Sequence, residues 1–104
     1  MNVIVLTGTL ASKPSMKEVQ ENLVLAQAII RVKSAKKTDD NEAQNEDFEV
    51  CFWNGNAKKI SEIEVGTKVE IRGRIVANNF TKEDGTVSYR NKLVAELVEV
   101  ERGL

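Results

Sequence analysis

Three aromatic side chains, Trp53, Phe80 and Tyr89, stand where strand alternation or a hairpin would expose them to solvent. An exposed flat ring can stack on any nucleic-acid base, and such stacking contributes about 1–3 kcal/mol per base regardless of sequence. Basic side chains near these rings could neutralise phosphates. They are Arg31, Lys33, Lys36, Lys37, Arg72, Arg74 and Arg90. Together these residues predict a surface that binds single-stranded nucleic acid.

Each candidate residue also has a structural interpretation. Trp53 could lie beneath a short helix that follows its strand, and Phe80 could anchor its own hairpin. We favour a ligand-facing Trp53 and a structural Tyr89, and both interpretations stay open for Phe80. Four of the cations could instead belong to a solvated strand face or a charged loop; these are Arg72, Arg74, Lys36 and Lys37.

The stretch 48–76 must position most of these residues. It opens with a strand whose alternation sends one set of side chains into the core and the other to the opposite face. The core set is Phe48, Val50 and Phe52. The opposite face carries Glu49, Cys51 and Trp53, and Trp53 is expected to meet solvent there. Asn54, Gly55 and Asn56 then signal a turn, and a short helix is predicted from Ala57 to Ile63.

A second alternating strand follows this helix and contributes two of the candidate cations. Val69, Ile71 and Ile75 share one of its faces. The opposite face carries Lys68, Glu70, Arg72 and Arg74. Gly73 marks a point at which the strand can bend.

The rest of the chain predicts further strands. Residues 3–10 are mostly apolar and β-branched, with a bend at Gly8. Residues 23–32 also permit a helix, but a strand is preferred because Ile29, Ile30 and Val32 cluster there. Residues 33–47 hold almost nothing apolar and predict a mobile hairpin tip at about 34–47.

The C-terminal part predicts a hairpin and a last strand. Asp84-Gly85 is a strong hairpin-turn signal, with a return strand beginning at 87–90 and a final strand over 93–100. The order is three strands, one short helix and two more strands. This order predicts an all-β protein with one short helix, folded as a five-stranded Greek-key barrel, the OB-fold. The chain is expected to form one such domain over residues 1–104.

Composition argues against an enzyme. The chain has no His and a single Cys, which removes Ser-His-Asp and Cys-His nucleophilic arrangements, His metal ligands and Cys-based zinc sites. The acidic run at 39–49 lacks the ligand spacing and turn glycine of a calcium loop. The glycines are too scattered for a nucleotide-binding loop. We therefore predict a binding protein with no catalytic residues, metal or cofactor.

Charge and hydropathy bound the class further. No apolar run approaches the roughly 20 residues needed to span a membrane, and the N-terminus lacks the basic region of a signal peptide, so a cytoplasmic protein is expected. The net charge of −1 conceals an asymmetry: residues 1–37 carry +4, residues 38–64 carry −6 and residues 65–104 carry +1. A binder of polyanions with this balance must gather its positive groups on one surface.

The chain resembles the bacterial and phage single-stranded DNA-binding proteins of the OB-fold class over nearly its whole length. The matching pieces are Asn2-Val3, Leu6 to Leu10, Pro14 and Lys17, then Glu46 to Trp53, then Ala57, Ser61-Glu62 and Gly66 to Ile75, and last Asn79 to Gly85 with Ser88-Tyr89. Each piece is weak alone, but their order and spacing together are fairly specific.

The resemblance implies sequence-independent binding of single-stranded DNA, in replication, recombination and repair. It places Trp53 and Phe80 where the family stacks bases, and puts the cations Arg31, Lys33 and Arg74 on strands that line the family's binding groove. Family members form homo-oligomers, more often tetramers than dimers, which pair first through the N-terminal strand. In this chain that strand is Met1 to Leu6.

The chain also departs from the family pattern. Lys36 stands near the position of another stacking aromatic, and residues 76–79 replace a basic cluster. The sequence ends at Leu104 without the family's acidic C-terminal tip, so no recruitment of other proteins through a tail is expected. These departures predict weaker DNA binding than that of a typical family member. The sparse aromatic residues and the slightly acidic charge balance favour an alternative function. It is a protein-interaction barrel, such as a primosome-type accessory factor, with weak nucleic-acid binding.

Overall fold

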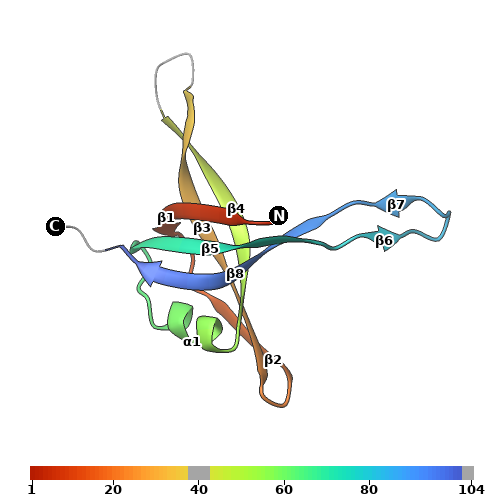
Figure 1. The fold of residues 1–104 in the computed structure, drawn as a ribbon, viewed down its shortest axis with the longest axis horizontal. Coiled ribbons are helices and arrows are strands. Elements are labelled where there is room, and N and C mark those ends of the chain that lie inside the picture. Colours follow the sequence, from red (N-terminus) through yellow and green to blue (C-terminus); the bar gives the residue numbers. More distant parts are fainter. Residues whose placement is uncertain (38–42, 102–104) are drawn as a thin grey trace.

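The computed structural model describes residues 1–37 and 43–101 and shows a closed barrel (Figure 1). The barrel strands are β1 (Ile4–Leu10), β3 (Leu23–Lys37), β4 (Ala43–Trp53), β5 (Lys68–Ala77) and β8 (Asn91–Val100). They lie in the order β1-β5-β8-β4-β3, and β3 pairs back with β1 at Thr9 and Leu10. All these pairings are antiparallel except that of β4 with β8. This Greek-key order confirms the predicted OB-fold.

Period-two alternation builds the core as expected. In β5 the side chains of Val69 and Ile71 are buried and Glu70 between them is exposed, whereas Ile75, expected on the same face as the first two, is 41% exposed. Val50 and Phe52 of β4 point inward, and Phe48 is half-buried against the same cluster. The other fully buried large side chains come from β1, β3, α1 and β8, and are Leu10, Ile30, Ile60 and Val98. One apolar cluster therefore fills the barrel.

The helix α1 (Gly55–Ser61) packs against β3, β4 and β8 through its buried residues Ala57 and Ile60. The predicted bounds, Ala57 to Ile63, were two residues too late. Asn54 explains the early start, because it takes a positive φ of 50° directly after β4. Its backbone N–H donates to the Val24 carbonyl at 2.9 Å, and its side-chain oxygen accepts from the Val24 N–H at 3.0 Å. The strand therefore stops at Asn54, and the helix can begin at once.

Three short strands lie outside the barrel order. The sequence analysis missed β2 (Ser15–Gln20), because all its side chains are exposed and no alternation marks it. It pairs with β3 through a turn at Asn22, whose φ is 64°. The predicted hairpin at Asp84-Gly85 is confirmed: β6 (Phe80–Thr81) and β7 (Val87–Ser88) pair antiparallel on either side of it. Figure 1 shows this hairpin projecting well away from the barrel.

The β3–β4 hairpin also projects from the barrel (Figure 1). Its strands run further than the sequence analysis expected, because Lys33 pairs with Asn45 and Lys37 with Ala43. Residues 34–37 and 43–47 of the predicted tip are therefore strand, with a register shift between Lys33 and Lys37, and residues 38–42 lie outside the described residues. Polar side chains suffice here because both faces of the ladder meet solvent. No helix in the described ranges is long and apolar enough to cross a membrane.

Gly73 sits where β5 comes closest to β8. A Cβ atom at this position would clash with the carbonyl oxygen of Val94, and the β5–β8 register shifts between Arg72 and Gly73. Replacing this glycine forces two paired strands apart inside the core, since the obstructing atom is backbone and cannot rotate away.

We expect Gly73→Ala to lower the free energy of unfolding by about 1–3 kcal/mol, the usual cost of overpacking. Urea denaturation followed by circular dichroism measures this change. Gly55→Ala is the matched control, because a Cβ there meets nothing within 4 Å. It should leave stability unchanged or raise it by up to about 1 kcal/mol. Equal stability of the two variants would contradict the close approach at Gly73.

Candidate nucleic-acid interface

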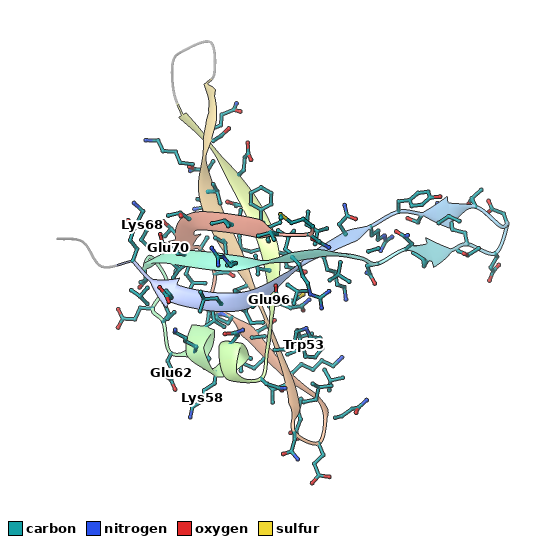
Figure 2. All side chains as sticks on the ribbon, viewed as in Figure 1. Trp53, Lys58, Glu62, Lys68, Glu70 and Glu96 are labelled. Atoms are coloured by element: carbon teal, nitrogen blue, oxygen red, sulfur yellow. The ribbon has the colours of Figure 1, made fainter. Side chains whose placement is uncertain are left out.

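Trp53 borders an open hollow on the outside of the barrel. It ends β4 opposite Leu25 of β3, and its side chain is half-buried. The hollow has a volume of about 280 Å³. Besides Trp53, its lining residues are Leu25, Cys51, Arg74, Val76, Ala77, Asn78, Lys92 and Val94. Figure 2 shows Trp53 on the side of the barrel from which β5 and β8 continue towards β6 and β7.

Cys51 also lines this hollow. It lies on the same face of β4 as Trp53, yet it is only 4% exposed. It pairs in register with Val94 of β8, and its Sγ lies 3.8 Å from Nε2 of Gln27 on β3. The half-buried indole borders the same hollow, whose lining includes the apolar side chains of Leu25 and Val94.

Two cations stand at the rim of this hollow. The Arg74 side chain is half-exposed, and its Nε lies 4.0 Å from a carboxylate oxygen of Glu96. An exposed ion pair of this length contributes little, so Arg74 can exchange its partner. Lys92, which lies opposite Val76, is exposed. The sequence analysis missed Lys92 because it began the last strand at Leu93; alternation extended by one residue would have found it.

Phe80 and Arg90 form a second aromatic and cationic group on the β6–β7 hairpin. The Cζ atom of Arg90 lies 4.7 Å from the centroid of the Phe80 ring, a cation–π contact worth about 0.5–1 kcal/mol at an exposed site. Phe80 therefore helps to hold its hairpin, yet 44% of its surface stays exposed. Tyr89 is 80% exposed and makes no aromatic contact among the described residues.

The hairpin turn is held by a local hydrogen-bond network. The Asp84 carboxylate accepts from the Thr86 N–H at 2.9 Å and from the Thr86 hydroxyl at 2.7 Å. Both bonds lower the pKa of Asp84 below its usual value, and the bond from the hydroxyl has the larger effect. Gly85 takes a φ of 89°, and its N–H donates to the Lys82 carbonyl at 2.9 Å.

Arg31 and Lys33 line a different hollow, of about 460 Å³, together with Lys68. The Arg31 guanidinium is already paired: Nε donates to Asp47 Oδ1 at 2.9 Å and Nη2 donates to Oδ2 at 3.1 Å. The hydrogen bond from Arg31 lowers the pKa of Asp47, and the bond to Asp47 raises the pKa of Arg31. This hollow therefore contains a neutralised cation.

The structure separates the remaining candidates. Arg72 lies opposite Val5 and Leu97 on the outer face of β1, β5 and β8, and lines a third hollow with both. Lys36 belongs to β3, but its side chain and that of Lys37 lie outside the described residues. Among the described residues of the predicted set, Trp53 and Arg74 meet at one hollow, and Arg31 and Lys33 meet at another.

The fold and this surface define an OB-fold barrel with a half-buried indole beside two cations. Comparisons place it more narrowly. The chain matches the model of the single-strand binding protein family over residues 1–101. It is 24% identical over 100 residues to single-stranded DNA-binding protein 3 of Listeria innocua, covering 95% of this chain and 62% of that protein. It is 22% identical to the single-stranded DNA-binding protein of Bacillus cereus, covering 95% of this chain and 59% of that one.

A solved structure agrees with the fold. A deletion mutant of the single-stranded DNA binding protein from Thermus aquaticus superposes with a TM-score of 0.75 at 18% identity, covering 99% of this chain and 51% of that chain. The chain belongs to the single-strand binding protein family. This membership confirms the resemblance and the prediction that the protein is not an enzyme. The chain spans less than two thirds of the length of these relatives.

The bond between Arg31 and Asp47 predicts a change in titration. Arg31→Ala should raise the pKa of Asp47 towards the ordinary value of about 3.9. A carboxyl group whose pKa is lower in the folded state than in the unfolded state stabilises the fold at a pH above its unfolded-state pKa. This stabilisation is lost as the pH falls through its folded-state pKa. Stability of the variant should therefore fall less steeply below about pH 5. Carboxyl-carbon NMR titration and acid unfolding measure the two effects.

Asp84 provides the internal control for this titration. Its pKa should not move in Arg31→Ala, and should rise in Thr86→Ala, which removes the hydroxyl bond without touching Asp47. An unchanged pKa of Asp47 after Arg31→Ala would show that the two side chains are not paired in solution.

Proposed function

We propose that this protein binds single-stranded DNA without sequence preference. The observation that carries the proposal is the half-buried indole of Trp53 at a hollow rimmed by Arg74 and Lys92. Membership of the single-strand binding protein family and the names of the Listeria and Bacillus relatives support it. Replication, recombination and repair all expose single strands, and the protein serves in these processes.

In the proposed mode of binding, one base stacks on Trp53 while its flanking phosphates contact Arg74 and Lys92. Stacking tolerates every base because each has a π-face, which gives binding without sequence preference. The β6–β7 hairpin extends this surface, and its exposed Phe80 takes a second base beside Arg90. On the other side, Leu25 of β3 lies between Trp53 and Lys17 of β2, so a further cation continues the row.

Stacking on these rings predicts the effect of removing them. Trp53→Ala and Phe80→Ala should each weaken binding of an oligo(dT) strand about five- to a hundredfold, since one stacked base contributes about 1–3 kcal/mol. Fluorescence anisotropy of a labelled oligonucleotide measures this at low and moderate salt, and affinity should fall as salt rises. In the unmodified protein, Trp53 fluorescence should be quenched on binding.

The control for this titration is Val65→Ala, which alters an exposed apolar side chain on the loop after α1. It should bind as the unmodified protein does. Absence of binding and of Trp53 quenching would favour the other function considered, a protein-interaction barrel acting as an accessory replication factor.

We also propose that the protein assembles through β1. This strand pairs with β5 from Ile4 to Thr9, whereas β3 reaches only Thr9 and Leu10. Among the described strands, the other edge of Ile4 to Thr7 has no partner. An open edge is a ready template for another strand, so β1 of a second copy can continue the sheet. Val5, 63% exposed, and Leu97, 45% exposed, then offer an apolar face on which two such dimers pack into a tetramer.

The assembly predicts a mass and a way to reduce it. Size-exclusion chromatography with light scattering should give the mass of four chains. Val5→Lys places a charge on the apolar face and should yield smaller species. Val65→Lys, at a similarly exposed apolar residue, should keep the original mass. A monomeric unmodified protein at micromolar concentration would rule out the proposed assembly.

A further inference from the structure

The carboxylate of Asp47 is hydrogen-bonded to the guanidinium of Arg31, which lines the hollow of about 460 Å³. Arg31 and Asp47 are directly opposite each other on β3 and β4, and two parallel hydrogen bonds of 2.9 and 3.1 Å join them. Both side chains are about half-exposed, at 48% and 45%. The strand register therefore presents the carboxylate to the guanidinium at the surface, where a nucleic-acid phosphate would also approach.

The surroundings of this pair repeat the same arrangement. Lys68 borders the hollow beside Arg31, and its Nζ lies 3.7 Å from a carboxylate oxygen of Glu101. Lys33 is the third cation of the lining. Two of these three cations thus have a carboxylate of the same chain in contact.

The hollow at Trp53 differs in this respect. The ion-pair distance from Arg74 to Glu96 is 4.0 Å, which is too long for a hydrogen bond. Lys92 makes no ion pair within residues 1–37 and 43–101. A phosphate can therefore pair with the cations near the indole more easily than with Arg31 or Lys68.

We propose that Asp47 is a built-in competitor for phosphate, which keeps Arg31 out of the DNA contact and leaves the Arg31–Lys33–Lys68 hollow as a latent phosphate site. The inference rests on the proposed function and adds a residue that sets its affinity. A carboxylate and a phosphate use the same bidentate geometry of the guanidinium, so only one can occupy it. DNA that enters this hollow must first displace Asp47. Contact of DNA with the Arg31–Lys33–Lys68 hollow therefore adds little to the binding free energy, and the DNA binds on the Trp53 side instead.

The test is Asp47→Asn, which removes the charge and keeps the shape. Affinity for oligo(dT) at low salt should rise about two- to fivefold, the worth of an exposed ion pair. The plot of log affinity against log salt should also steepen by about 0.7, because one more cation becomes available to phosphate. Anisotropy titrations at several salt concentrations measure both quantities.

Two further variants separate this mechanism from a general charge effect. Glu49→Gln removes the same charge two residues along β4, where the carboxylate contacts Gln27 at 3.4 Å and no cation among the described residues. It should give a smaller gain and no change in slope. In the Asp47→Asn background, Arg31→Ala should remove the gain in affinity. When Asp47 is present, the same Arg31→Ala substitution should lower the affinity less.

The outcomes distinguish the two proposals. Binding by the unmodified protein, with equal gains in Asp47→Asn and Glu49→Gln, would overturn the competitor role and leave the proposed function standing. An equal cost of Arg31→Ala in both backgrounds would do the same. No binding by the unmodified protein or by any variant would overturn both proposals.

Discussion

Closure of the barrel depends on two backbone contacts that leave no room for a side chain. A Cβ atom at Gly8 would clash with the carbonyl oxygen of Arg31, and one at Gly73 would clash with that of Val94. Near Gly8, the pairing partner of β1 changes from β5 to β3. At Gly73, β5 and β8 approach closely where their register shifts. A sheet of five strands can close on itself only if it bends sharply at such points.

The shape of the candidate site follows from this closure. Since β5 and β8 stay paired as far as Ala77 and Asn91, their ribbon lines the hollow that Cys51 and Trp53 border at the end of β4. The same ribbon carries Arg74 and Lys92 to the rim of the hollow at Trp53. A flat ring backed by apolar side chains is held in place, and a held ring loses less conformational freedom when a base stacks on it. The glycine contacts therefore contribute to the site without being part of it.

Electrostatics divide the outer surface into regions of different availability. The chain is nearly neutral overall, and many of its acids lie in the segment that includes β4. Antiparallel pairing of β3 with β4 brings one of these acids, Asp47, directly opposite a cation of β3, Arg31. The cations of β5 and β8 near Trp53 face fewer carboxylates. A protein with little net charge can in this way keep one face open to a polyanion.

Much of the fold could be read from the sequence, because alternation, turn residues and the absence of His report local preferences directly. They determined the barrel, the short helix, the exposed position of Phe80 and the exclusion of common catalytic groups. Alternation could not show that Cys51 is buried, because it reports only neighbours in the chain, and residues that line the same hollow, such as Arg74, lie more than 20 positions away. Nor could it show β2, whose pairing rests on backbone hydrogen bonds alone. Only the tertiary structure decided which cations meet the indole. Arg72 and Arg74 share one face of β5, yet twist and strand order place the first beside Val5 and the second beside Trp53.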